Sequence, residues 1–258
     1  MSGGAGPVLR VKGLGVTYGA LVALDDVTWS VGAGEILGII GPNGAGKSSC
    51  YDAVTHLVRR QGQVFLKGEE VTAVAPHLLA ERGLKRAFQQ NAFFHELTVL
   101  ENMVTVLQDR YGTSLVAATL LPFSEARRRR AAVEDARQRL LRFGIPEMYH
   151  GLKPTNIPYG TQRMLSIALA YGSGAQALLL DEPAAGLGGV DMTHLVNLLL
   201  SLKNEGLAVV VIEHHMDLIM SVADRIVVLE QGRQIAMGTP HEIQSDPRVL
   251  EAYLGHTQ

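Results

Sequence analysis

Hydrophobic residues follow different spacings along this chain, and each spacing predicts a type of element. Alternating or short continuous apolar runs predict strands at 8–17, 21–31, 35–40, 63–66 and 84–89. Helical spacing or composition predicts a short helix starting near residue 76 and helices at 97–108, 124–143 and 161–170. The middle of the chain is therefore predicted to be a mostly helical insert.

Strands and helices alternate in the rest of the chain. The predicted strands lie at 177–180, 208–212, 225–229 and 233–236, and the predicted helices at 191–204 and 216–223. Such alternation is typical of an α/β fold in which helices cover both faces of a mainly parallel sheet. Gly238 to Pro240 then open a C-terminal helical tail that ends near Leu254.

Composition narrows the possible partners. The 258 residues are 47% hydrophobic and 19% charged, as in a globular protein with a sizeable core, in one large domain or two small ones. A net charge of −2 and a pI of about 6.5 provide no global basic field, so nucleic acid is not expected as a partner. The single cysteine, Cys50, cannot form an internal disulfide and fits a reducing compartment.

Neither a membrane span nor a secretion signal is expected. No apolar run approaches the roughly 18 residues that a membrane helix needs. The N-terminal residues MSGGAGPVLR lack the apolar centre of a signal peptide. We therefore expect a chain that neither crosses a membrane nor is secreted.

A glycine-rich loop, GPNGAGKSS, separates the predicted strand at 35–40 from a segment at 50–57 that can be helical. It fits G-x-x-x-x-G-K-[ST], so backbone N–H groups can wrap a phosphate without interference from a β-carbon, and the helix dipole favours the anion. Lys47 would reach the β- and γ-phosphates, and Ser48 would offer a hydroxyl ligand to Mg²⁺. A glycine turn formed by chance is the weaker alternative, because four fixed positions match in the required strand-to-helix context. We expect nucleotide contacts along the whole loop, at Gly41, Pro42, Asn43, Gly44, Ala45, Gly46, Lys47, Ser48 and Ser49.

Two of the later strands end in ionisable residues. The strand at 177–180 leads into Asp181 and Glu182, and the strand at 208–212 leads toward His214. Ligands of parallel sheets bind beyond the carboxyl ends of the strands, so these side chains can meet the phosphates. Asp181 would hold Mg²⁺, directly or through water, and Glu182 would act as general base on the attacking water. His214 could contact a γ-phosphate, although most single histidines are structural or merely exposed.

Tyr18 lies at the end of the first predicted strand. An aromatic ring at this place could stack on an adenine, and stacking of bases on aromatic side chains is worth about 1–3 kcal/mol elsewhere. A tyrosine at a strand end more often serves packing. The residues alone leave both roles open.

The order of these motifs resembles the nucleotide-binding subunit of an ATP-binding-cassette (ABC) transporter over essentially the whole chain. The resemblance implies a P-loop NTPase fold of the ABC type, with a mainly parallel core sheet and an N-terminal antiparallel β subdomain. It implies one nucleotide-binding domain over 1–258, with a helical subdomain inserted at about 91–172 and a C-terminal helical tail at about 239–258. The implied activity is hydrolysis of ATP, with ATP and Mg²⁺ as cofactors.

The resemblance also implies roles for single residues. Tyr18 matches the family's adenine-stacking tyrosine, and Gln89 matches the Q-loop glutamine that contacts Mg²⁺. Lys47, Glu182, His214 and Gln89 form the implied catalytic set, whereas Ser48, Asp181 and Gln89 form the implied metal set.

Within the family, four stretches resemble branched-chain amino acid importers and their urea and amide relatives: Phe88-Gln89, Pro158 to Gly160, Asp181 to Leu187 and the tail from Gly238. We therefore expect an ATP-hydrolysing importer subunit for a small polar solute, most readily branched-chain or other amino acids. The implied partners are a second cassette subunit, two membrane permeases and an extracytoplasmic substrate-binding protein, which places this chain at the cytoplasmic face of the membrane. A urea or amide importer, a lipid or polysaccharide exporter, a soluble cassette without a transport role, and a regulator with little hydrolysis are the alternatives.

Two departures from the family pattern shape the expected assembly. The usual signature Leu-Ser-Gly-Gly-Gln is replaced by Ile157, Pro158, Tyr159, Gly160 and Thr161, so no serine hydroxyl can reach a γ-phosphate. Gly188 stands where the family's D-loop usually carries aspartate. Because cassette subunits pair head to tail, we expect a heterodimer in which a partner supplies an intact signature and the site at 157–161 turns over more slowly.

Overall fold

A six-stranded sheet forms the centre of the part of the chain that carries the glycine-rich loop. Its strand order is β10-β9-β3-β8-β7-β6, parallel throughout except for the antiparallel pair of β9 and β10. Every residue of β3, β7 and β8 is buried, which explains their continuous apolar sequences. The six strands are β3 (Ile36–Ile40), β6 (Leu84–Ala87), β7 (Ala177–Asp181), β8 (Ala208–Ile212), β9 (Arg225–Glu230) and β10 (Arg233–Gly238). The predicted mainly parallel sheet is confirmed.

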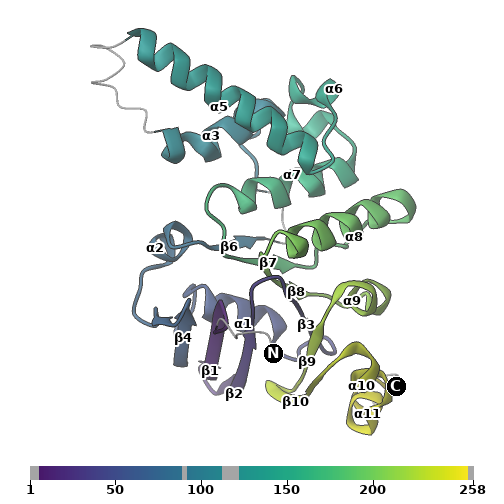
Figure 1. The fold of residues 1–258 in the computed structure, drawn as a ribbon. Helices are drawn as coiled ribbons and strands as arrows, with labels where there is room; N and C mark the ends of the chain where they lie inside the picture. The colour runs from purple at the N-terminus through teal and green to yellow at the C-terminus, as the bar shows by residue number, and fades with distance from the viewer. Residues whose placement is uncertain (1–5, 89–91, 112–121, 255–258) are drawn as a thin grey trace. The chain divides into compact units, whose positions relative to one another are not determined.

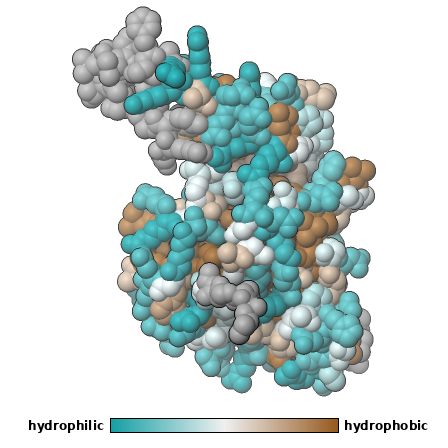
Figure 2. All heavy atoms as spheres, viewed as in Figure 1, coloured by the Kyte–Doolittle hydropathy of each residue, from teal (hydrophilic) through white to brown (hydrophobic). Residues whose placement is uncertain are grey.

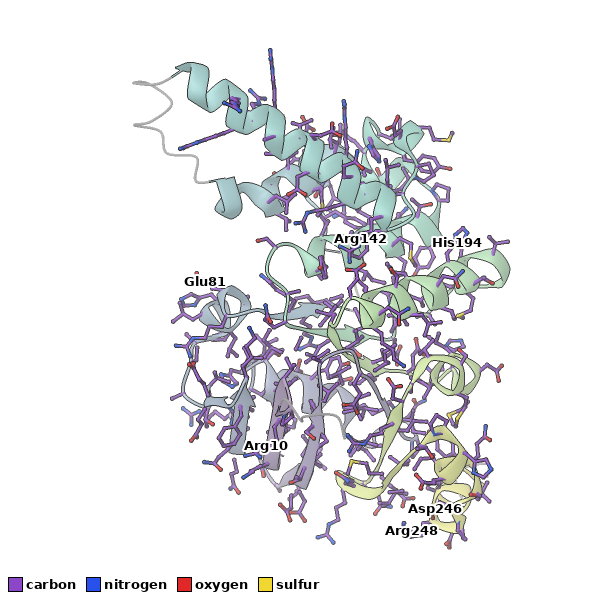
Figure 3. All side chains as sticks on the ribbon, viewed as in Figure 1. Arg10, Glu81, Arg142, His194, Asp246 and Arg248 are labelled. Carbon is purple, nitrogen blue, oxygen red and sulfur yellow. The ribbon has the colours of Figure 1, made fainter. Side chains whose placement is uncertain are left out.

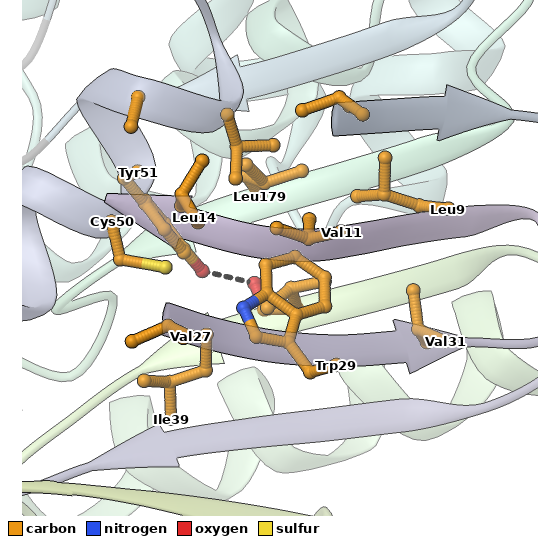
Figure 4. Close-up of a cluster of buried hydrophobic side chains, with 14 of the residues drawn as sticks. Leu9, Val11, Leu14, Val27, Trp29, Val31, Ile39, Cys50, Tyr51 and Leu179 are labelled. Carbon is orange, nitrogen blue, oxygen red and sulfur yellow. Dashed lines mark hydrogen bonds between the residues drawn. The ribbon is translucent and has the colours of Figure 1, made fainter. Parts of the chain in front are cut away.

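A second sheet has four antiparallel strands in the order β2-β1-β4-β5. They are β1 (Leu9–Tyr18), β2 (Leu21–Val31), β4 (Gln61–Leu66) and β5 (Glu69–Glu70). Buried positions alternate along much of β1, as in a strand with one face on the core. Figure 4 shows this core, where Leu14, Trp29 and Tyr51 lie among side chains from both sheets.

The computed structural model describes residues 6–88, 92–111 and 122–254, which form two compact units. Unit 1 comprises Met1–Gln89, Ala175–Ala185 and Leu195–Gln258 and contains both sheets. Unit 2 comprises Gln90–Gly174 and Gly186–His194, and the range 91–172 predicted for the helical insert lies inside it.

The helices of unit 1 refine the sequence predictions. Helix α1 (Lys47–Val54) begins within the GPNGAGKSS stretch, earlier than the segment at 50–57. The other helices with most of their residues in this unit are α2 (Pro76–Glu81), α8 (Gly189–Asn204), α9 (Met216–Val222), α10 (Pro240–Ser245) and α11 (Pro247–Leu254). The predicted helical tail consists of two helices, because Pro247 lacks the N–H that would extend α10.

Two short-range pairings define the tail. Thr239 and Glu242 form a reciprocal capping box at the start of α10. Arg248 then pairs with Asp246 across the boundary between the two helices, with 2.7 Å between Nη2 and Oδ2 (Figure 3). These contacts stabilise the start of α10 and the junction between α10 and α11.

Unit 2 is helical. It contains α3 (Val99–Tyr111), α5 (Pro122–Arg142), α6 (Glu147–His150), the 3₁₀ turn η1 (Pro154–Asn156), α7 (Tyr159–Tyr171) and the first residues of α8 (Figure 1). The predicted helices correspond to α3, α5 and α7, whereas α6 and η1 are too short to produce a periodic signal. Most of the coloured side chains over α5 are hydrophilic in the view of Figure 2. Across the described ranges, no helix is both long and apolar enough to span a bilayer.

Candidate nucleotide-binding and catalytic site

The shape of the glycine-rich loop requires glycine at two positions. Gly41 has a φ of +154°, and a β-carbon there would collide with the carbonyl oxygen of Leu229. Gly46 has a φ of +99°, and its β-carbon would lie 2.5 Å from the carbonyl oxygen of Ala23. Larger residues at either position would therefore push the loop away from its neighbours.

Lys47 is the first residue of α1, and its side chain folds back over the loop. Nζ donates to the carbonyl oxygens of Gly41 at 2.7 Å and Pro42 at 3.0 Å. An ammonium group has three N–H donors, so one remains for a phosphate oxygen. Burial lowers the pKa of Lys47, while the negative charges of Glu182 and Asp181 oppose this shift.

A cleft of about 550 Å³ opens along the loop and brings several predicted residues together. It is lined by Tyr18, by the loop from Asn43 to Ser49, and by Glu182. Leu21 and Val22 also line it, and they are 65% and 54% exposed next to the 45% exposed Tyr18. Sequence reasoning missed these two residues because their exposure is known only from the fold. Exposed apolar groups beside a phosphate loop can accommodate a purine ring.

Asp181, the last residue of β7, is held by a residue that sequence reasoning missed. Arg86 places Nη2 at 3.3 Å from the Asp181 carboxylate and Nη1 at 2.6 Å from Asp52. Burial raises the pKa of Asp181, and the Arg86 charge opposes that shift. The Asp181 carboxylate and the exposed Ser48 hydroxyl are hard oxygen ligands, so their chemistry fits Mg²⁺.

Glu182 adopts a left-handed backbone conformation with a φ of +46°. Such a conformation costs a residue other than glycine about 1–3 kcal/mol and persists only where neighbours hold it. The N–H of Glu182 donates to the carbonyl oxygen of Ile212 at 2.9 Å. Oε1 of Glu182 lies 3.6 Å from Nδ1 of His214, so the structure brings these two predicted residues together.

Glu213 holds the turn that follows Glu182, and it was not predicted as a functional residue. Its side chain is fully buried, and Oε1 accepts the N–H of Ala184 at 2.7 Å. Oε2 accepts the backbone N–H groups of His214 at 3.0 Å and His215 at 3.2 Å. One carboxylate therefore ties the turn after Glu182 to the segment that carries His214.

Tyr51 links α1 to β7 and β8. Its hydroxyl lies 2.9 Å from the carbonyl oxygen of Leu180 and 2.5 Å from that of Val210. It also accepts the N–H of Ile212 at 3.1 Å. Leu180 precedes Asp181, so the helix that follows the phosphate loop is fastened to the strand that presents the carboxylates.

The predicted signature residues form the start of α7 in unit 2. Ile157 is buried, and Pro158 is the N-cap residue, with no side-chain hydrogen bond to cap the helix. Tyr159 is the first helical residue and is 49% exposed, and Gly160 and Thr161 follow it. A β-carbon at position 160 would collide with the Asp191 carboxylate, so a larger residue there requires that side chain to move. Neither residue 158 nor residue 160 therefore offers a side-chain donor to an anion at the N-terminus of α7.

Gly188 leaves open space where a side chain could stand, since a β-carbon there would have no atom within 4 Å. Gln89 lies outside the described residues, so its predicted contact with Mg²⁺ stays a prediction. A further residue near the loop comes from the tail: burial raises the pKa of Tyr253 on α11 to about 12, and its hydroxyl approaches the backbone of Gly41.

Known proteins resemble this chain in both sequence and fold. A family model described as ABC transporter matches residues 24–185, and one described as branched-chain amino acid ATP-binding cassette transporter matches residues 233–257. The high-affinity branched-chain amino acid transport ATP-binding proteins BraF of Pseudomonas aeruginosa and LivG of Escherichia coli are 36% and 35% identical over 251 residues, covering 96% of this chain and 98% of theirs.

More distant relatives widen the comparison. The lipopolysaccharide export system ATP-binding protein LptB of Haemophilus influenzae is 30% identical, covering 96% of this chain and 97% of its own. The ADP conformation of MJ1267, an ATP-binding cassette of an ABC transporter, superimposes with a TM-score of 0.82 at 28% identity, covering 97% of this chain and 100% of that one.

The phosphate loop and the strand-end carboxylates lie within the region that the first family model matches, and the relatives match almost the full chain. The chain belongs to the ABC transporter family, as an ATP-binding subunit that hydrolyses ATP.

Proposed function

We propose that this chain is the ATP-hydrolysing subunit of an importer for branched-chain amino acids. The observation that carries the proposal is the match of the tail, residues 233–257, to a family model for branched-chain amino acid cassettes. The names of BraF and LivG support the same solute class. The chain would work at the cytoplasmic face of the membrane, attached to two permeases and supplied by an extracytoplasmic substrate-binding protein.

The site geometry supports specific roles in hydrolysis. Tyr18 would stack on the adenine, and the loop from Gly41 to Ser49 would hold the phosphates, with Lys47 nearest to the γ-phosphate. Ser48 and Asp181 would hold Mg²⁺, which neutralises charge on the phosphate oxygens when it is bound. Gln89 would contact the same ion.

Glu182 and His214 would then act on the reaction itself. Glu182 would take a proton from the attacking water, since its carboxylate lines the cleft. His214, whose Nδ1 lies 3.6 Å from Oε1 of Glu182, would contact the γ-phosphate. Glu213 ties the turn after Glu182 to the segment that carries His214, so neither side chain needs to reorganise its backbone during turnover.

The assembly proposed here is a heterodimer with another cassette subunit. Its support is the α7 N-terminus, where Pro158 cannot donate to a phosphate and provides no cap. The partner's signature would complete the site at Lys47, and the site at Ile157 to Thr161 would turn over more slowly. Pro158→Ser should then raise ATPase activity of the assembled complex, and an unchanged rate would reject the asymmetry.

The name of LptB favours an exporter as the second candidate function. The two functions differ in direction and solute, so transport in cells that encode this chain decides between them. Uptake of radiolabelled leucine, isoleucine and valine should fall in a Glu182→Gln strain to background, while uptake of labelled lysine stays unchanged. Normal leucine uptake together with a cell-envelope defect would favour the exporter.

The oligomeric state can be tested on the purified chain. Light scattering of Glu182→Gln with and without Mg-ATP should give a monomer in both conditions if a different partner is obligatory, provided that ATP binding is demonstrated. A doubled mass with Mg-ATP would show that Ile157 to Thr161 works as a signature in a homodimer.

A further inference from the structure

Three neighbouring side chains beyond the end of β8 carry atoms that could ligate a metal ion. Nδ1 of His215 lies 3.1 Å from Oε2 of Glu213, and Nδ1 of His214 lies 3.8 Å from the same oxygen. One ligand atom from each of the three residues lies within 4.8 Å of the other two. The two imidazole rings are 4.3 Å apart and inclined by 39°. In the proposed hydrolysis only His214 of this group contacts the nucleotide.

Two of the three separations between ligand atoms are close to those around a tetrahedral ion. Zn²⁺ binds imidazole nitrogen and carboxylate oxygen at about 2.0–2.2 Å, which places neighbouring ligand atoms about 3.4 Å apart. The observed 3.1 Å and 3.8 Å separations lie on either side of this value. Two imidazoles and one carboxylate form a known zinc-ligand set with an open fourth position. Mg²⁺ prefers oxygen ligands, so it is a poor match for this group.

The surroundings suit a cation that enters from one side. The Glu213 side chain is fully buried, whereas those of His214 and His215 are 51% and 39% exposed. An ion can therefore approach through the imidazoles and meet the buried carboxylate behind them. Oε1 of Glu182 lies 3.6 Å from Nδ1 of His214, one of the three ligand atoms.

We propose that Glu213, His214 and His215 bind Zn²⁺, or a transition-metal ion with the same ligand preference, and that the bound ion inhibits ATP hydrolysis. The ion would bind between Nδ1 of His215 and the Glu213 carboxylate and hold the His214 ring against that carboxylate. It would also place positive charge beside Glu182, which makes this carboxylate a weaker base. The inhibitory part rests on the proposed roles of His214 and Glu182, whereas binding of the ion does not.

Binding is tested on the untagged full chain without nucleotide. Titration calorimetry with ZnCl₂ should show one ion per chain, and Co²⁺ should give the visible absorption of a four-coordinate site. His215→Asn keeps an N–H near Glu213 but removes the imidazole, so it should weaken binding about tenfold or more. The matched control is His194→Asn, at an exposed histidine of α8 (Figure 3), which should bind as wild type does. Absence of saturable binding, or equal binding by His215→Asn, would overturn the site.

Inhibition is tested separately, with excess Mg-ATP and buffered free Zn²⁺. Wild-type activity should fall as the site fills, and His215→Asn should stay active at the same free Zn²⁺. Stoichiometric binding without inhibition of the wild type would refute the inhibitory role alone. Normal zinc-free activity of His214→Ala would instead refute the proposed role of His214, and the binding measurement would still stand or fall by itself.

Discussion

The carboxylate of Asp191 occupies the space beside Gly160 that a β-carbon at position 160 would need. Gly160→Ala should therefore displace Asp191 and lower the free energy of unfolding by up to about 1–3 kcal/mol, the usual cost of overpacking. Because Asp191 is the obstacle within the chain, Gly160→Ala/Asp191→Ala should regain the stability of Asp191→Ala alone. Thermal unfolding of the four proteins measures this coupling.

The same variants separate packing from function. If the backbone at Gly160 also approaches a phosphate of the partner subunit, the double variant should recover its melting temperature but not the ATPase activity of the assembled complex. Full recovery of both would mean that position 160 is a glycine only to make room for Asp191.

Glu182 and His214 should differ in what their loss removes. Glu182→Gln keeps the shape of the side chain but not its basicity, so we expect ATP binding near the wild-type level and a rate reduced by about 10²–10⁴-fold. His214→Ala should reduce the rate more than it reduces ATP affinity. ATP binding by equilibrium dialysis and single-turnover hydrolysis give the two quantities. Equal losses of binding and rate in His214→Ala would indicate a structural histidine.

Tyr51→Phe removes a single buried hydroxyl at the junction of α1, β7 and β8. We expect a loss of about 0.5–1.5 kcal/mol, the net worth of a buried hydrogen bond, and a melting temperature lower by a few degrees. The rate should fall while the KM for ATP stays unchanged, because the hydroxyl bonds Leu180 next to Asp181 and does not line the cleft. Tyr149→Phe, in α6, is the matched control. A lower melting temperature with a normal rate would limit Tyr51 to a structural role.

Burial raises the pKa of Asp181, and this shift has a consequence for stability. A carboxyl group whose pKa is raised by folding binds its proton more tightly in the folded state. Its contribution to the free energy of unfolding is therefore greatest at low pH and falls as pH rises through the folded-state pKa. Without Mg²⁺, Asp181→Asn should therefore be more stable than wild type at pH 7, and the difference should shrink toward pH 4.

Thermal unfolding between pH 4 and pH 8 in chelator checks this prediction. Arg86 also contacts Asp52 at 2.6 Å, so its charge should not be left unpaired in this variant. Mg-ATP should stabilise wild type and fail to stabilise Asp181→Asn. A less stable Asp181→Asn at pH 7 would show that the Arg86 pair outweighs burial.

The sequence predicted the parts of the site that follow from chain order. Gly41 to Ser49, Asp181 and Glu182, and His214 each follow a strand of continuous apolar residues, and the parallel sheet brings the strand ends together. Arg86 and Tyr51 could not be predicted, because their partners lie 95 and 129 residues away along the chain. Glu213 was visible as the neighbour of His214, but its burial depends on how the turn after β7 packs.

A second group of residues could not be predicted because the exposure of their side chains depends on the fold. Leu21 and Val22 look like ordinary strand residues, and only the paired strands show that both side chains stay exposed at the cleft. The N-terminus of α7 shows the opposite case. In the sequence, Gly160 is recognised only because it matches a position of the family's signature. The structure gives a physical reason for glycine there, since the Asp191 side chain, 31 residues later, packs against it in the fold of unit 2.

Cys50 offers a direct probe of the phosphate loop, because it is the only cysteine and lies in α1. It is fully buried, and burial raises the pKa of its thiol to about 12. The thiolate is the reactive form, so at pH 8 roughly one thiol in ten thousand would be reactive even if reagent could reach it. We expect iodoacetamide to modify the native chain very slowly and the chain unfolded in guanidinium at the normal rate.

Binding of ATP should slow this modification further. A ligand at 100 times its Kd stabilises the folded state by about 2.7 kcal/mol, which lowers the population of opened molecules about 100-fold. Lys47→Ala, which lacks the loop ammonium, should lose the protection by Mg-ATP while keeping slow modification without nucleotide. Mass spectrometry of the alkylated chain over time gives both rates. Rapid modification of native wild type would show that α1 opens without unfolding, and protection of Lys47→Ala equal to that of wild type would remove Lys47 from the phosphate site.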